Sequence, residues 1–144
     1  MSGALSHDYD LTFEKTAIDP VAAHEFLSTS YWASNIPLDT VKRAIANSVC
    51  VAVRHGEKQV GFARVVTDKA TFAYLADVYV LEEHRGQRLA FSMVKALQDH
   101  PDLQGLRRWL LATLDAHALY AELEWEPLPD PAIMMQRHFP DIYQ

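Results

Sequence analysis

The stretch DVYVLEEHRGQRLAFSMVKALQ, residues 77–98, changes its hydrophobic period part-way along. Its first residues end an apolar run over 71–81 that is long enough for a strand. After a polar loop, apolar residues recur at helical spacing, at Leu89, Met93, Val94 and Leu97. This pattern predicts a helix over Leu89–Gln98 and indicates an α/β domain in which a strand feeds a helix.

The loop of this stretch has the features of an anion site. A loop that enters a helix presents unpaired backbone N–H groups and the positive end of the helix dipole, which suit a pyrophosphate. Arg85 and Arg88 add positive charge there, and Gly86 allows the backbone to approach a ligand closely. An ordinary strand-to-helix turn with a basic loop explains these residues equally well, so both interpretations stay open on physical grounds alone.

Short elements are expected on the N-terminal side of this stretch. Alternation of apolar and polar residues predicts a strand over 10–15. A helix is expected over Pro20–Leu27, with Asp19 as its cap and Pro20 in its first turn, and a second helix over 37–46. Three β-branched runs joined by short turns predict an antiparallel meander, with strands over 49–54, 60–67 and 71–81.

The C-terminal side should complete a mixed sheet. The apolar run over 109–112 follows the helix and predicts a strand parallel to its neighbour. Asp115 can cap a short helix over 116–123, and the proline-rich tail can hold at most short strands, near Trp125 and over 133–136. The expected fold is of the α/β (α+β) class, a mixed and mostly antiparallel sheet flanked by helices in the order β-α-α-β-β-β-α-β-α-β. With 144 residues, it should form one domain over 1–144.

Composition excludes several classes of protein. Hydrophobic residues make up 49% of the chain and charged residues 22%, close to a soluble globular average and unlike disordered, collagen-like or coiled-coil chains. A net charge of -6 without a dense Lys/Arg stripe argues against a nucleic-acid partner. No apolar run approaches the roughly 20 residues of a membrane helix, and residues 1–9 do not resemble a signal peptide. We therefore expect a cytoplasmic protein with no membrane partner.

Other catalytic classes lack their signatures in this chain. Cys50 is the single cysteine and lies in an apolar run, which favours a buried thiol over a nucleophile. Seven histidines occur without an HExxH motif or Cys/His metal spacing, so no metal site is predicted. The chain also lacks the G-x-S-x-G elbow of serine hydrolases and the glycine-rich loops of nucleotide-binding folds.

The loop over 85–90 resembles the acetyl-CoA-binding motif Q/R-x-x-G-x-G/A of the GNAT superfamily of N-acetyltransferases. Arg85 matches its first position and Ala90 its last. The similarity covers nearly the whole chain, and the segment Ala-His-Ala-Leu-Tyr over 116–120 resembles small stand-alone bacterial members. This resemblance implies a GNAT-like fold, acetyl-CoA as co-substrate, and transfer of its acetyl group to a primary amine that attacks the thioester directly.

Two positions depart from the family pattern. Arg88 stands where the motif usually has glycine, and Glu124 stands where glycine often precedes an aromatic residue, here Trp125. An Arg88 side chain that points inward would obstruct a phosphate, whereas one that points outward could add a phosphate contact. The departures leave open an alternative function, a catalytically silent module that binds CoA or a protein partner without turnover.

The resemblance also implies where acetyl-CoA binds. Backbone groups of Val78, Tyr79 and Val80 would hold the pantetheine and the thioester carbonyl, with the Val80 N–H as the oxyanion donor. Core packing explains the same valine side chains, and both roles can hold together because the first uses backbone atoms alone. The pyrophosphate would be bound by the loop and the helix start, at Arg85, Gly86, Gln87, Arg88, Leu89 and Ala90.

Catalytic and acceptor-binding side chains are implied as well. Tyr120 matches the tyrosine that protonates the coenzyme A thiolate as general acid, although a half-buried ring on an amphipathic helix is its alternative role. Asp77 could act as general base, or it could be a surface residue or the ion-pair partner of Arg64. Tyr31 and Trp32 could hold a cationic amine by cation–π contact or instead cap the core. The acceptor, a small molecule or a peptide, is not encoded in these motifs, and a homodimer is expected only by analogy with the family.

Overall fold

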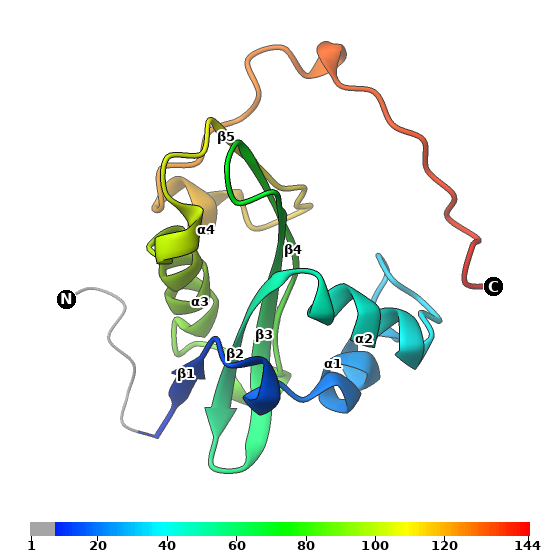
Figure 1. The fold of residues 1–144 in the computed structure, drawn as a ribbon, viewed down its shortest axis with the longest axis vertical. Coiled ribbons are helices and arrows are strands. Elements are labelled where there is room, and N and C mark those ends of the chain that lie inside the picture. Colours follow the sequence, from blue (N-terminus) through cyan, green and yellow to red (C-terminus); the bar gives the residue numbers. More distant parts are fainter. Residues whose placement is uncertain (1–7) are drawn as a thin grey trace.

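An antiparallel meander extended by one parallel strand forms the centre of the fold (Figure 1). The computed structural model describes residues 8–144, so most of the segment 1–9, where we expect no signal peptide, lies outside them. Neighbouring strands follow chain order, and each pair is antiparallel except the last. The strands are β1 (Asp10–Thr12), β2 (Val49–His55), β3 (Lys58–Thr67), β4 (Phe72–Val80) and β5 (Arg108–Leu110).

Helices cover both faces of this sheet, which confirms the predicted fold class. Two of them lie on one side, α1 (Pro20–Leu27) and α2 (Leu38–Ala46). On the other side lie α3 (Leu89–Gln98) and α4 (His117–Ala121), beside the parallel strand pair (Figure 1). The bounds of α1 and α3 are those that the sequence predicts, and α2 begins one residue later than expected.

The strand β2 separates two hydrophobic cores. Because successive side chains of a strand point to opposite faces, Val51 and Val53 pack in the core that α3 covers, whereas Cys50 and Ala52 pack in the core under α1 and α2. Cys50 is buried, as predicted, and burial raises the pKa of its thiol to about 11. The thiol is therefore protonated and unreactive at neutral pH.

The start of α1 follows its predicted chemistry. One carboxylate oxygen of Asp19 accepts the N–H of Val21 at 2.9 Å and the N–H of Ala22 at 3.1 Å. Pro20 takes the first helical position, where its missing N–H costs nothing. Asp19 is also tied to β3, because its backbone N–H donates to the side chain of Gln59 at 2.8 Å. The cap therefore fixes both the start of α1 and its place on the sheet.

The helix α4 is shorter than the expected helix over 116–123, and Asp115 does not cap it. Ala116 takes the N-cap position, and its N–H donates to the Thr113 hydroxyl at 3.1 Å. The other end is closed by Glu124, whose φ is 72°. The N–H groups of Glu124 and of the residue after it bond back to carbonyls of the last turn at 3.1 Å each. This is the Schellman arrangement, whose left-handed position favours glycine.

The expected last strand is wrong. After α4 the described chain contains only a 3₁₀ turn at Pro131–Ile133, and every residue from 126 to 142 is exposed. Prolines at 127, 129, 131 and 140 cannot donate to a ladder, and the tail runs apart from the strand edges (Figure 1). The first strand is also shorter than predicted, since β1 ends at Thr12. Within residues 8–144, no helix has the length and apolar character needed to cross a membrane.

Candidate active site

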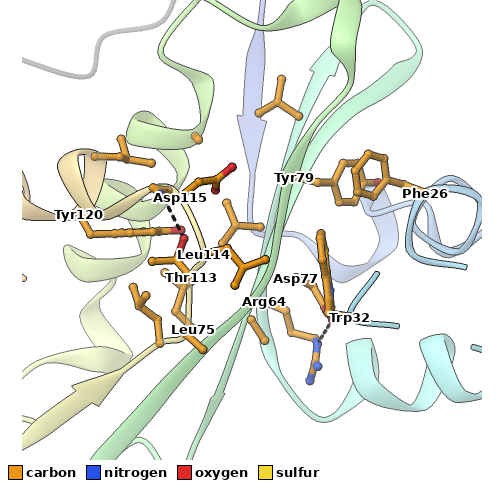
Figure 2. Close-up of a pocket in the computed structure, with 18 of the residues that line it drawn as sticks. Phe26, Trp32, Arg64, Leu75, Asp77, Tyr79, Thr113, Leu114, Asp115 and Tyr120 are labelled. Carbon is orange, nitrogen blue, oxygen red and sulfur yellow. Dashed lines mark hydrogen bonds and ion pairs between the residues drawn. The ribbon is translucent and has the colours of Figure 1, made fainter. Parts of the chain in front are cut away.

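A cavity of about 940 Å³ opens where β4 and β5 separate (Figure 2). The two strands pair only from Phe72 opposite Arg108 to Tyr74 opposite Leu110, so β5 ends before the expected 112. Beyond Tyr74 the edge of β4 faces the cavity, and the segment after β5 forms part of the opposite wall. Backbone N–H and C=O groups on such an open strand edge are available to a ligand.

A bulge in β4 shapes this edge. Ala76 pairs with Arg64 and Tyr79 pairs with Phe62, so β4 has one more residue than β3 between these pairs. Asp77 lies in the bulge with a φ of 57°, a left-handed conformation that costs a non-glycine residue about 1–2 kcal/mol. Bulges redirect side chains next to active sites, and Asp77 here forms part of the cavity wall.

The Asp77 carboxylate is held by two donors (Figure 2). The indole N–H of Trp32 donates to one oxygen at 2.8 Å, and the Nε of Arg64 donates to the other at 2.8 Å. The side chain of Asp77 is only 11% exposed, and Arg64 also donates to the Ser48 hydroxyl at 3.2 Å. Of the roles open to Asp77, the structure shows the ion pair with Arg64. A role as general base remains a prediction.

The loop before α3 forms the opposite end of the cavity. The Nε of Arg85 donates to the Val80 carbonyl at 3.0 Å, which ties the loop to the end of β4. Gly86 has a φ of 83°, and open space surrounds the position of its missing Cβ. Arg88 is the N-cap of α3 and makes no side-chain cap bond, so the first N–H groups of α3 lack an acceptor within the helix. Gln87 is exposed in this loop and is not part of the cavity lining.

Arg88 adopts a left-handed backbone conformation, which favours glycine. Its φ is 59°, and its guanidinium lies 3.2 Å from the Glu122 carboxylate and 4.2 Å from the centroid of the Phe91 ring. Both charged side chains are more than half exposed. The side chain is thus engaged by α3 and by the residue after α4, while the loop keeps a glycine-like path.

Tyr120 projects from α4 into the cavity, with its hydroxyl directed toward the segment of Thr113 and Asp115 (Figure 2). The residue is 8% exposed, and its ring packs edge-on against Trp125 at 5.8 Å. Trp125 is itself fixed, because its indole N–H donates to the Gln98 side chain at 2.7 Å. Burial raises the pKa of Tyr120, so the phenol is protonated at neutral pH and can donate a proton.

Aromatic side chains surround the far end of the cavity. Tyr31 and Trp32 line it and are 71% and 42% exposed. Phe26 stacks on Tyr79 at 4.1 Å between ring centroids (Figure 2). Burial raises the pKa of Tyr79 to about 12. Tyr143, near the C-terminus, also lines this end.

Residues 18–125 match the family model described as the acetyltransferase (GNAT) family. This chain belongs to the GNAT acetyltransferase family. A protein of Gibberella zeae with a provisional acetyltransferase name is 31% identical over 138 residues, a match that covers 80% of this chain and 77% of that protein. The resemblance that the loop over 85–90 suggests is therefore confirmed at the level of the family.

Solved structures of GNAT proteins share the fold. A provisionally assigned GNAT acetyltransferase from Xanthomonas campestris is 44% identical, with a TM-score of 0.91 over 97% of this chain and 99% of that chain. The structure of Rv2747 from Mycobacterium tuberculosis, which contains CoA and NLQ, is 20% identical. Its TM-score is 0.63 over 83% of this chain and 75% of that chain.

In this GNAT chain, most of the residues predicted from sequence meet around one cavity. The structure brings together the β4 edge, the loop, Tyr120, Asp77 and the two aromatic residues before α2. The cavity is also lined by residues that the sequence does not mark as site residues, namely Phe26, Thr113, Leu114, Asp115 and Tyr143. Tyr143 lies beyond the part of the chain that matches the GNAT model, and no local pattern marks it.

Proposed function

We propose that this chain transfers the acetyl group of acetyl-CoA to a primary amine, with the amine attacking the thioester directly. One observation carries the proposal: an open strand edge, an uncapped helix N-terminus and a buried tyrosine line the same cavity. We also propose a single domain over 1–144 and a cytoplasmic location, which the one buried, free cysteine fits.

The residues present fit coenzyme A. The N–H groups at the start of α3 and in the loop over 86–88 would bind the pyrophosphate, with Gly86 leaving the space that close approach needs. The edge of β4 over 78–80 would bind the amide groups of the pantetheine. CoA in the Mycobacterium tuberculosis structure supports this assignment through the shared fold.

The direction of the Val80 N–H supports its role as oxyanion donor. The N–H of Leu81 donates to the Val60 carbonyl in β3 at 2.8 Å. Because successive N–H groups of a strand point to opposite sides, the Val80 N–H is directed toward the cavity. The Arg85 bond to the Val80 carbonyl comes from the same side. A fixed N–H at this point would stabilise charge that develops on the thioester oxygen.

The proton balance assigns the remaining roles. As the new C–N bond forms and the C–S bond breaks, the thiolate needs one proton, which Tyr120 would supply. The amine must lose one proton to a carboxylate or to water. Asp77 is the candidate base from sequence, but both of its oxygens are occupied, so we favour a role in holding Trp32 and Arg64 at the acceptor end.

Tyr31 and Trp32 would contact the acceptor amine. Both rings are exposed toward the cavity and lie edge-on to each other at 5.1 Å, an arrangement that can hold a cation against an aromatic face. Trp32 is also fixed by its bond to Asp77. The silent-module alternative rests on an obstructing Arg88, and the pairing of that side chain with Glu122 weakens it.

Calorimetry with acetyl-CoA, followed by thiol release from a panel of amines, tests the proposal. We expect binding by the natural protein and amine-dependent release of free thiol. Arg88→Gly serves as the matched control for the loop. Binding without release for any amine would favour the silent module, and a failure of both proteins to bind would refute the coenzyme A site.

A further inference from the structure

The cavity contains two carboxylates, and their surroundings differ. Within residues 8–144, the acidic residues that line it are Asp77 and Asp115. Both oxygens of Asp77 accept hydrogen bonds, and its side chain is only 11% exposed. Asp115 is exposed and makes no hydrogen bond or ion pair with any residue that the structure describes. Of the two, Asp115 is therefore the carboxylate that is free to accept a proton.

Asp115 lies on the same wall of the cavity as Tyr120. It belongs to the segment between β5 and α4, and Figure 2 shows its side chain pointing into the cavity from that wall. The Tyr120 hydroxyl is directed toward this segment as well. Tyr120 is 8% exposed, whereas Asp115 is open to solvent. Water in the cavity can therefore bridge the carboxylate and the buried phenol.

The start of α4 gives no structural reason for an aspartate at position 115. Aspartate is among the best helix N-caps and alanine among the poorest, yet Ala116 is the N-cap and the helix start has no side-chain cap bond. The hydroxyl of Thr113 accepts the N–H of Ala116 at 3.1 Å, so the turn closes without the carboxylate. A residue that departs from a local rule without a structural gain is expected at a functional site.

The histidine among the described lining residues is less well placed to accept this proton. His84 lies in the loop before α3, at the proposed coenzyme A end of the cavity. Its Nδ1 is 3.0 Å from the Tyr9 hydroxyl, and its ring packs against that of His55 at 5.0 Å between centroids. Asp115 has no such contacts and shares its wall with the proposed proton donor.

We propose that Asp115 accepts the proton that the amine loses and returns it to Tyr120. As the amine nitrogen attacks the thioester carbon, the C–N bond forms and the Asp115 carboxylate takes one proton from the nitrogen. The C–S bond then breaks, and Tyr120 gives its phenolic proton to the thiolate. The proton on Asp115 moves through water to the phenolate, so both side chains return to their first state. This relay rests on the proposed function and gives the proton of the amine a destination.

Asp115→Asn separates this role from helix capping. Asparagine keeps the size of aspartate and caps helices equally well, but it cannot accept the proton. The assay is thiol release by the full-length protein with 2-phenylethylamine, spermidine, glucosamine and a peptide with a free N-terminus. We expect kcat to fall about 10²-fold or more, while the urea midpoint and the affinity for acetyl-CoA stay unchanged. Asp10→Asn, at an exposed carboxylate outside the cavity lining, removes the same charge and should keep the natural kcat.

The double variant Asp115→Asn, Tyr120→Phe tests whether the two residues act as one relay. The effects of residues that act as a unit are not additive, so the double variant should be at most about threefold slower than Tyr120→Phe alone. If the two losses in kcat instead multiplied, the residues would act separately, and the relay would be wrong.

Two further results would overturn the proposal in distinguishable ways. If the natural protein acetylates an amine and Asp115→Asn loses less than about tenfold in kcat, the proposed function stands and the role of Asp115 is wrong. If the natural protein binds acetyl-CoA but releases no thiol with any of these amines, the proposed function fails, and the relay fails with it.

Discussion

The two ends of the cavity are built in different ways. The proposed coenzyme A end comes mainly from one continuous stretch, the end of β4, the loop and α3. The acceptor end is assembled from α1, the loop before α2, the bulge in β4 and Tyr143 near the C-terminus. Its contacts join residues far apart in sequence, 45 positions for Trp32 with Asp77 and 109 for Asn35 with Gln144.

This difference predicts how each end responds to substitution. At the proposed coenzyme A end, backbone N–H groups would bind the ligand, so a side chain such as Arg88 can replace glycine if the backbone keeps its left-handed conformation. At the acceptor end, side chains make the surface, so each replacement alters what the cavity can hold. One scaffold can therefore keep its co-substrate and change its acceptor.

The largest expected effect lies between the two ends, at Tyr120. Tyr120→Phe keeps the ring and its packing on Trp125 but removes the proposed proton donor. We expect kcat to fall about 10²- to 10⁴-fold, with the affinity for acetyl-CoA unchanged, as measured by thiol release and calorimetry. A turnover rate within threefold of the natural value would assign proton donation to another group.

The same residue should set the alkaline limit of activity. Burial raises the pKa of Tyr120, so the phenol stays neutral beyond its ordinary value near ~10. We expect kcat to hold up to about pH 10 and to fall as pH rises through the folded-state pKa. The stability that the buried, neutral phenol contributes is likewise lost as the pH rises through this pKa. Measuring kcat between about pH 8 and 11 for the natural protein and for Tyr120→Phe tests this fall in activity at high pH.

The face of α3 against the sheet should carry the next largest effect, on stability. Leu97 is fully buried in the core that α3 covers, and Leu97→Ala should lower the free energy of unfolding by about 2–5 kcal/mol. Val66→Ala, a truncation at an exposed position of β3, should change it by less than about 0.5 kcal/mol. Urea unfolding of both variants measures the difference, and equal losses would contradict this placement of the core.

A smaller effect separates the two roles of Asp77. Asp77→Asn keeps an acceptor for the Trp32 indole and removes the charge opposite Arg64. If Asp77 positions the acceptor end, the amine KM should rise several-fold and kcat should fall less than about tenfold. If turnover instead slowed by a factor of about 100 or more and the acidic limb of the pH profile disappeared, Asp77 would be the base.

The sequence predicts the parts of this molecule that depend on neighbouring residues. The bounds of α1 and α3, the Asp19 cap and the loop over 85–90 follow from local spacing and backbone chemistry. The bulge at Asp77 does not, because it depends on the register between two strands. The tail is the clearest case. Its apolar residues over 133–136 suit a strand, but this segment pairs with no strand of the described sheet and lies exposed, because pairing depends on long-range contacts that local spacing does not specify.

Arg88 gives the smallest and most exacting test of the difference between the two ends. Arg88→Ala loses the contacts with Glu122 and Phe91 and keeps the left-handed strain. Arg88→Gly loses the same contacts and relieves the strain, which costs about 1–2 kcal/mol.

The two Arg88 variants differ only in backbone preference. Glycine adopts the left-handed conformation without strain, and its greater flexibility in the unfolded chain offsets part of this gain in stability. We therefore expect Arg88→Gly to be more stable than Arg88→Ala by about 1 kcal/mol, measured by urea unfolding, with both variants binding acetyl-CoA within a few-fold of the natural protein. If Arg88→Gly instead bound far more tightly than the natural protein, the Arg88 side chain would obstruct the loop. The coenzyme A end would then depend on side chains as much as the acceptor end does.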